Sequence, residues 1–506
     1  MQVSDTSSSS HVVLAKGAAI FLAGRGLGRV FGLVAQAVLA RLLTPAVFGL
    51  YALGWTVFRL AELLGPLGLQ AGALRFASAS AARDPASARP VVTKAVGLAA
   101  VSGTLLGITV FALAPELARI VFHKPEAAGV LRWFSLGFPF LSVLIVAAVA
   151  TQALQTNRYL ATVRELGQPM LIALLAPAAV VAGFGVEGAA AGTVAATVLT
   201  AIAAVVLANR LFPSSERVWP GLSSRKLLAV SIPAAAASSF RLLLAWTDRF
   251  VVGACLPSAS LGAYHAGAQL ASILSMIPLA FAGILGAIIV TALATGEAGR
   301  ARALYRTTIK WMLFLAIPVL VPLIVAPREA LGVVFGPAYA AAAVPLRILA
   351  MGQGLSLLTG TVGALLVMTG HERRWAALAG MSFLTNLALS VWLTPRWGLT
   401  GAAFSTAVAL AVLTVLGIWS ASVALDGSCL DLKVARPLIL LALGIGGGFL
   451  VLPYLPSTAV LRLVALLGMT LVTVGVGLVL FGFDPEEREI YDALRVRLGH
   501  TGSPEK

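Results

Sequence analysis

Five arginines stand inside apolar stretches of this chain, where a charged side chain is costly: Arg25, Arg29, Arg59, Arg241 and Arg249. An arginine at the centre of a membrane span costs about 2.5–3.5 kcal/mol on insertion scales, so such residues usually face a cavity or a partner. The planar guanidinium group matches the oxygens of phosphate in a two-pronged geometry. These residues therefore indicate a site for an anionic group, of which phosphate or pyrophosphate fits best.

Arg25 and Arg29 are the clearest of these candidates. They are spaced four apart, so a helix would place them one turn from each other on one face, where their like charges repel. Arg25 also lies about eleven residues, or roughly 16 Å, into the apolar stretch, which is too deep for its charge to reach the membrane surface easily. A purely structural role explains this poorly, and we expect Arg25, Arg29 and Arg241 to line a water-filled cavity.

Two acidic residues, Glu62 and Asp248, accompany these arginines and are candidates for coupling to an ion or for ion pairing. Arg59 and Glu62 are three residues apart and could simply neutralise each other instead of serving a ligand. Asp248 and Arg249 fall near one end of their apolar stretch, which favours an interfacial position. For His265 we expect a position at a helix end and not a role in a proton relay.

The composition indicates that these charged residues lie on membrane-spanning helices. The chain has 506 residues, of which 59% are hydrophobic and only 11% charged, whereas soluble domains carry about 25% charged residues. This excludes a water-soluble protein and predicts an all-α polytopic membrane protein. The net charge of +16 comes from basic residues scattered singly between apolar spans, so the expected counterpart is the membrane lipid headgroups and not nucleic acid.

A membrane-spanning helix needs about 20 apolar residues. We predict about 14 transmembrane helices, at residues 14–41, 46–72, 91–113, 130–154, 160–183, 187–209, 227–254, 262–293, 304–326, 341–368, 373–394, 399–424, 433–453 and 458–481.

The sequence contains an internal repeat at an offset of 213 residues. Residues 48–54 (FGLYALG) resemble 261–267 (LGAYHAG), residues 184–190 (FGVEGAA) resemble 397–403 (WGLTGAA), and Val121-Phe122 falls on Val334-Phe335. The repeat predicts two six-helix lobes with parallel orientation and a central cavity between them. The expected divisions are a polar segment 1–13, an N-lobe 14–210, a linker 211–226, a C-lobe 227–424, two extra helices within 433–481 and an acidic tail 482–506.

The glycines of the first span are the remaining motif. Gly24, Gly28 and Gly32 are spaced four apart, but no strand precedes them, so they do not form a phosphate-binding loop. We expect them to give a smooth helix face for close packing. The sequence has no nucleotide-binding loop and no His or Cys pair at metal-ligand spacing, and we therefore expect no catalytic residue, no metal and no cofactor.

The segment 43–53 (LTPAVFGLYAL), followed by 67–75 (LGLQAGALR), resembles the opening of the bacterial polysaccharide biosynthesis exporters. These are the O-antigen and exopolysaccharide flippases of the multidrug/oligosaccharidyl-lipid/polysaccharide exporter superfamily. The block Pro-x-x-Phe-Gly-x-Tyr, from Pro45 to Tyr51, is its most specific motif. The likeness extends over essentially the whole chain, including the two lobes, the two C-terminal helices and arginines in the first, second and seventh helices.

The resemblance implies a secondary-type transporter of the bacterial cytoplasmic (inner) membrane and not an enzyme. Its substrate would be an undecaprenyl-pyrophosphate-linked oligosaccharide, carried to the outer leaflet by alternating access. Arg25, Arg29, Arg59 and Arg241 would hold the pyrophosphate, with energy from an ion gradient or from removal of the product. The expected partners are the lipid-linked oligosaccharide, membrane lipids and a glycan polymerase, and the expected state is a monomer.

Three other functions are alternatives. A lipid II flippase shares the fourteen helices and the cavity arginines. A multidrug antiporter of the superfamily usually has twelve helices and an acidic cavity, which the surplus of arginines argues against. A membrane-embedded glycan ligase would need catalytic acids or a sizeable loop outside the membrane, and the longest hydrophilic segment, 482–506, is an acidic tail.

The loop charges predict the orientation. Lysines and arginines concentrate on the cytoplasmic side of membrane proteins, and most of those here lie on the cytoplasmic side if both termini do. We therefore expect that a reporter fused after Lys506 is active in the cytoplasm. A fusion active only on the outer side would contradict this orientation.

Overall fold

The computed structural model describes residues 4–213 and 223–481, and over these the chain is helical throughout. The tail 482–506 and most of the predicted linker, residues 214–222, lie outside the described residues. Helices of the first half are α1 (Ser4–Leu42), α2 (Pro45–Leu64), α3 (Leu69–Ala81), α4 (Arg89–Glu116), α5 (Ala127–Leu136), α6 (Phe138–Ala150), α7 (Arg158–Leu160), α8 (Gln168–Ala179) and α9 (Gly185–Leu211).

Helices of the second half follow the same plan. They are α10 (Ser224–Cys255), α11 (Ser258–Ala271), α12 (Met276–Ala294), α13 (Ala298–Val325), α14 (Pro327–Val334), α15 (Ala343–Ser356), α16 (Val362–Met368) and α17 (Glu372–Ala424), and then α18 (Leu432–Val451) and α19 (Ala459–Phe481).

Nine helical segments of the described chain are long and apolar enough to cross a membrane, or ten if the bent α10 is one span. Two of the nine, Arg158–Leu211 and Glu372–Ala424, have more than 50 residues each and turn at an internal glycine. The fold is that of a multi-pass membrane protein, while the count of fourteen spans stays a prediction. Helix α1 starts at Ser4 and not near residue 14, because hydropathy marks the apolar part of a helix and not where its hydrogen bonding begins.

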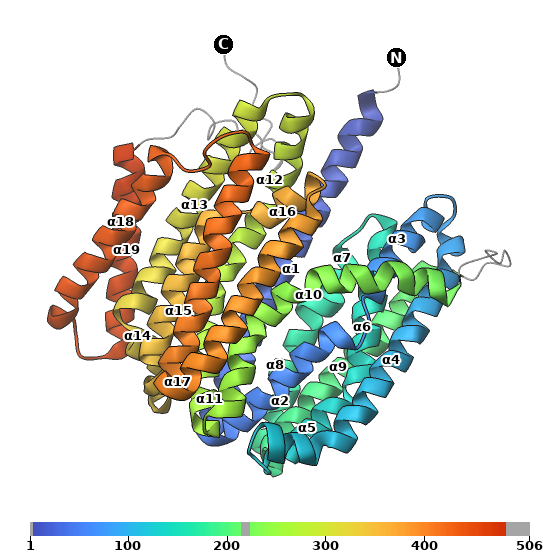
Figure 1. The fold of residues 1–506 in the computed structure, drawn as a ribbon, viewed down its shortest axis with the longest axis horizontal. Helices are drawn as coiled ribbons and strands as arrows, with labels where there is room; N and C mark the ends of the chain where they lie inside the picture. Colours follow the sequence, from blue (N-terminus) through green and yellow to red (C-terminus); the bar gives the residue numbers. More distant parts are fainter. Residues whose placement is uncertain (1–3, 214–222, 482–506) are drawn as a thin grey trace.

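Figure 1 shows two groups of helices, α2 to α9 on one side and α11 to α17 on the other. Helices α18 and α19 pack on the outer flank of the second group, against α13. Helix α1 begins and α19 ends at the same end of the molecule, whereas α14 and the connection between α18 and α19 lie at the opposite end. The residue boundaries of the predicted lobes remain a prediction.

The 213-residue repeat is visible in the backbone. Helix α1 ends at Leu42 and α10 at Cys255, and α2 begins at Pro45 and α11 at Ser258, each pair at the same offset. Gly185 and Gly398, also equivalent, have φ of 57° and 60° with ψ of −144° and −139°. Only glycine adopts this conformation without strain, so the same glycine turn separates two helices in both halves.

The two groups meet where α2 packs on α11. A Cβ on Gly49 would overlap the carbonyl oxygen of Ser258, and one on its repeat partner Gly262 would overlap that of Pro45. The contact is therefore reciprocal, since each half offers the same glycine face to the other. Such close backbone approach is how small residues bring membrane helices together without a hydrophobic driving force. The contact between α2 and α11 therefore joins the two helix groups at one end of the space between them.

Candidate functional site

A cavity of about 280 Å³ lies between the two helix groups. Its walls come from α1, α2, α8 and the π-helical turn η4 (Ala161–Gly167) on one side, and from α10, α11, α12 and the turn η6 (Ser272–Ser275) on the other. Four arginines and two glutamates line it: Arg25, Arg29, Arg59, Arg164, Glu62 and Glu165. The cavity is therefore cationic in sum, which suits an anionic ligand.

Helix α1 supplies two of these arginines through close packing on η4. A Cβ on Gly28 would overlap the carbonyl oxygen of Glu165, and one on Gly24 would lie 3.2 Å from the Cβ of Ala161. This approach brings Arg25 Nε to 3.3 Å from a carboxylate oxygen of Glu165. The expected smooth glycine face is confirmed for these two glycines, whereas Gly32 has no such neighbour within 4 Å in the described chain.

Helix α2 supplies Arg59 and Glu62. Arg59 Nη1 lies 2.5 Å from Glu62 Oε1, so the two do neutralise each other in part. Glu62 is shared, because its other oxygen lies 3.9 Å from Arg164 Nη2. The guanidinium of Arg59 also lies 5.8 Å from the ring centroid of Trp55 and 5.7 Å from that of Trp246. Both rings can stabilise the cation through their π faces while the arginine reaches the cavity.

Arg29 is exposed to the space between the helix groups. Among the described residues it forms no ion pair at contact distance, although it senses the charges of Arg25 and Arg59 as well as those of Glu62 and Glu165. A guanidinium held against two like charges has most to gain from an added anion. Arg29 is thus the least compensated cation of the cavity.

Arg241 lies on α10, across from these residues. It is exposed and within electrostatic range of Arg25, but it is outside the set of residues that line the cavity. Helix α10 bends by 53° between Ser224–Ala235 and Ser239–Cys255. Pro233, which removes a backbone hydrogen bond, lies just before this bend. Arg241 lies on the segment Ser239–Cys255, so the bend determines the direction of the helix that carries it.

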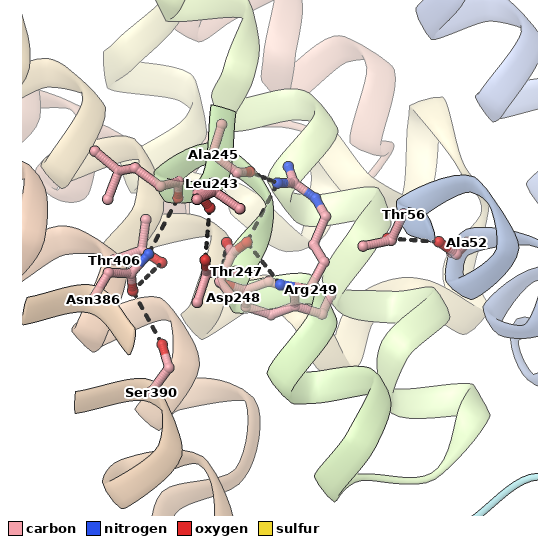
Figure 2. A network of polar contacts seen from close by, with 12 residues as sticks. Ala52, Thr56, Leu243, Ala245, Thr247, Asp248, Arg249, Asn386, Ser390 and Thr406 are labelled. Carbon is pink, nitrogen blue, oxygen red and sulfur yellow. Dashed lines mark hydrogen bonds and ion pairs between the residues drawn. The ribbon is translucent and has the colours of Figure 1, made fainter. Parts of the chain in front are cut away.

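Asp248 and Arg249 lie farther along α10, in a separate polar network that Figure 2 shows. Asp248 accepts hydrogen bonds from the Tyr264 hydroxyl at 2.8 Å and from the Arg249 backbone at 2.7 Å. The Arg249 guanidinium lies 3.4 Å from the same carboxylate and stacks on Trp246, at 4.6 Å from the ring centroid. Trp246 thus stands between the network and Arg59 in the cavity.

The interfacial interpretation of Asp248 and Arg249 is wrong. Their exposed fractions are 2% and 7%, because α11 and α17 cover this part of α10. His265 is likewise fully buried in the middle of α11, and neither ring nitrogen has a hydrogen-bond partner in the described chain. Hydropathy shows how far a residue lies from the end of an apolar stretch. Whether its side chain is exposed depends on which other helices pack against that position.

The network continues onto α17. Asn386 donates to the Leu244 carbonyl at 3.2 Å and accepts hydrogen bonds from Ser390 at 3.0 Å and Thr406 at 3.5 Å. Figure 2 shows these side chains facing α10 at the level of Asp248. Hydroxyl, amide and carboxylate oxygens therefore gather in a buried region of the second helix group.

The repeat shows which parts of this network are structural. The Tyr51 hydroxyl lies 3.0 Å from that of Thr193. The equivalent residues of the second half, Tyr264 and Thr406, donate hydrogen bonds to Asp248 and Asn386 instead. The residue equivalent to Asp248 is Ala35. The carboxylate is therefore not required by the packing that both halves share.

Sequence reasoning missed two charged residues of the cavity, Arg164 and Glu165, and its three aromatic residues, Trp55, Phe58 and Trp246. Arg164 and Glu165 were overlooked because they fall at the start of a predicted span, where charges are normal. The signal that could have found them is Gly28, since a glycine inside an arginine-bearing helix marks close approach by another backbone.

We expect Gly28→Ala to lower the free energy of unfolding by about 1–3 kcal/mol, as overpacking does, because its methyl group would separate α1 from η4 and Arg25 from Glu165. Thermal unfolding of the purified protein in detergent measures this. The matched control is Gly32→Ala on the same helix, which has free space and should keep or raise the unfolding temperature. Equal unfolding temperatures for the two variants would contradict the contact.

Three comparisons place this architecture among known proteins. The chain matches the family model described as polysaccharide biosynthesis protein over residues 14–289. It is also 28% identical over 171 residues to a protein of Haloferax volcanii named probable low-salt glycan biosynthesis flippase Agl15. That match covers 34% of this chain and 36% of the relative, so it spans about a third of either protein.

Solved structures share the fold at low identity. The lipid II flippase MurJ in an inward closed conformation superposes with a TM-score of 0.74 at 11% identity, covering 91% of this chain and 98% of that one. An inward-facing multidrug resistance MATE transporter of the MOP superfamily gives 0.66 at 16% identity, covering 78% and 94%. These likenesses show the fold alone, whereas the family match covers more than half of the sequence. The chain belongs to the polysaccharide biosynthesis protein family.

Proposed function

We propose that this protein is a flippase that moves an undecaprenyl-pyrophosphate-linked oligosaccharide across the cytoplasmic membrane by alternating access. The observation that carries the proposal is the cationic cavity between the two helix groups, with Arg25, Arg29 and Arg59 on its wall. The family match and the named function of the Haloferax volcanii relative support a lipid-linked glycan as substrate.

The chemistry of the cavity fits the pyrophosphate of such a lipid. The anionic oxygens of the pyrophosphate would accept charge-assisted hydrogen bonds from Arg25, Arg29 and Arg59. Their negative charge would also offset the repulsion among the three guanidinium groups. Glu62 and Glu165 hold Arg59, Arg164 and Arg25 in place through ion pairs. An arriving anion would compete with the two glutamates for these guanidinium groups. Because the Arg25–Glu165 ion pair joins α1 to η4, its loss on binding would allow α1 to shift against η4. Arg241, on the other group, would approach the anion when the two groups close.

The sugar part has suitable neighbours too. Trp55, Phe58 and Trp246 line the same cavity as the arginines. Aromatic faces provide flat apolar area beside polar groups, which allows one cavity to hold both a charged linkage and a glycan. We place the repeat unit of an O-antigen or exopolysaccharide here. A lipid II flippase is the alternative, on the ground of the fold shared with MurJ. A multidrug antiporter fits less well, because cationic drugs would be repelled.

Replacing Arg25, Arg59 or Arg241 by alanine should abolish export while the protein still inserts into the membrane. The loss of one charged contact is about 1.5–3 kcal/mol, or roughly 10- to 150-fold in affinity. Lysine at the same positions should restore only part of the activity, because the two-pronged geometry is lost. The measurement is the lipid-linked sugar that accumulates on the inner leaflet of cells that carry each variant.

Arg396→Ala is the matched control, since Arg396 is an exposed arginine of α17 that stacks on Trp392 and lies outside the cavity. It should export normally. Full export by all three variants, Arg25→Ala, Arg59→Ala and Arg241→Ala, would refute the role of these arginines. The identity of the accumulated lipid separates the alternatives: a peptidoglycan precursor would favour a lipid II flippase over a polysaccharide exporter.

We infer that Asp248 couples transport to an ion gradient. It is a buried carboxylate on α10, a helix that contacts both helix groups. The equivalent position of the first half has no carboxylate, and oxygen atoms of Asn386, Ser390 and Thr406 lie nearby on α17. A cation bound at the Asp248 carboxylate would weaken the ion pair between Asp248 and Arg249. Arg249 and Arg59 both contact Trp246, so a movement of Arg249 would reach Arg59 through that ring.

Asp248→Asn should therefore remove the dependence of transport on an imposed sodium or proton gradient, with ligand binding kept within about twofold, a change of roughly 0.4 kcal/mol. Transport into vesicles containing the purified protein, with each gradient imposed in turn, measures this. Glu116→Gln, at an exposed carboxylate paired with Arg119, is the control and should keep gradient dependence. Unchanged gradient dependence in Asp248→Asn would rule out this carboxylate as the coupling group.

A further inference from the structure

A second cavity, of about 370 Å³, lies at the end of the molecule opposite to the start of α1. It is formed where α13 ends, by α14, by the turn η7 (Pro337–Ala342), by the start of α15 and by the turn η9 (Leu452–Tyr454) that follows α18. None of its lining residues belongs to the central cavity. It is therefore a separate site at the junction of the second helix group with the two C-terminal helices.

The wall of this cavity is apolar except for three charged side chains. Val325, Ala340, Ala343, Val344 and Leu452 contribute the apolar part. The charged residues are Arg328, Glu329 and Arg347. Glu329 is already satisfied, since its carboxylate lies 3.0 Å from Nη1 of Arg462 on α19. The cavity thus presents two arginines and no free acid of its own.

Arg347 is held in a fixed orientation. Its Nε donates a hydrogen bond to the Ile324 carbonyl at 2.7 Å, and its guanidinium lies 5.5 Å from the ring centroid of Phe449 on α18. These contacts leave the terminal nitrogens free to face the cavity. Arg328 is exposed on α14, and in the described part of the chain neither arginine is paired with a carboxylate. Two uncompensated guanidinium groups around one cavity are a recognition pattern for phosphate.

The surroundings indicate a lipid and not a soluble anion. Val344, on the cavity wall, and Leu450, just before Leu452, are 52% and 74% exposed. Tyr454, two residues beyond Leu452, is 88% exposed at the end of the turn η9. Exposed aliphatic side chains next to a tyrosine at a helix end are typical of the boundary between hydrocarbon and headgroups. An ion alone would use only the arginines, whereas a lipid would also use the apolar wall.

We propose that this cavity binds the phosphate of a membrane lipid, with Arg328 and Arg347 on the phosphate and the first carbons of the chain along Val344 and Leu452. The site goes beyond the proposed function and does not depend on it. Two sources share this chemistry: an anionic phospholipid of the surrounding leaflet, or a polyprenyl phosphate. With both termini in the cytoplasm, as the loop charges predict, the site faces the outer leaflet.

The test uses the full-length purified protein, freed of lipid and titrated with short-chain phosphatidylglycerol, with a polyprenyl phosphate and with inorganic phosphate. Native mass spectrometry gives the Kd of each complex. Arg328→Gln combined with Arg347→Gln should raise the Kd for the lipid phosphate about tenfold or more, as loss of charged hydrogen bonds does. Because Arg347 also contacts Ile324, Val344→Trp serves as a second variant that fills the cavity and leaves both arginines in place; it should weaken lipid binding as well.

Arg119→Gln is the matched control, an exposed arginine near the end of α4 that is paired with Glu116. It should leave the Kd of each complex unchanged. A preference for phosphatidylglycerol would identify the source as the leaflet, and a preference for the polyprenyl phosphate would identify it as a carrier lipid. Equal Kd values for wild type and for both cavity variants, or binding of inorganic phosphate as tight as that of either lipid, would overturn the proposal.

Discussion

The cost of keeping a guanidinium group away from water governs the arrangement of this protein. Each arginine in an apolar span costs about 2.5–3.5 kcal/mol, and the structure offsets that cost with a carboxylate, an aromatic ring or an open cavity. Arg25 has Glu165, Arg59 has Glu62 and two tryptophans, and Arg249 has Asp248 and Trp246. Arg29 has the cavity alone. Four arginines face two glutamates around the cavity, so the compensation is incomplete, and the space beside Arg29 is where an anion would be bound most favourably.

The compensation depends on how closely helix backbones approach. Gly28 lets η4 bring Glu165 beside Arg25, and the reciprocal glycines Gly49 and Gly262 join the two helix groups. Membrane helices gain little from apolar burial against each other, because lipid is equally apolar, so contact area and polar pairing decide the packing. Small residues thus perform two tasks here, since they hold the groups together and position charges that would otherwise be unpaired.

The two halves show the same packing but different chemistry. Gly185 and Gly398 form the same turn, and Tyr51 and Thr193 are equivalent in the repeat to Tyr264 and Thr406. Against this shared frame, the first half carries the arginines of the cavity and the second half carries the buried carboxylate. A duplicated scaffold can divide tasks in this way because packing constrains only the positions that both copies use. The charged positions of each half, such as Arg59 in the first and Asp248 in the second, are then free to diverge.

The sequence by itself determined what a local pattern can encode. Hydropathy established a helical membrane protein, three matching blocks established the 213-residue offset, and charge within apolar runs singled out Arg25, Arg29 and Arg59. These features are readable because each depends on residues that are neighbours along one helix. Only the tertiary structure decided which charges meet. Arg164, Glu165 and Trp246 join the cavity through contacts across more than 100 residues of sequence, Arg241 stands beside its lining, and Asp248 and His265 are buried by α11 and α17. Burial against another helix and burial in lipid require the same apolar sequence, so the distinction appears only when the helices are packed.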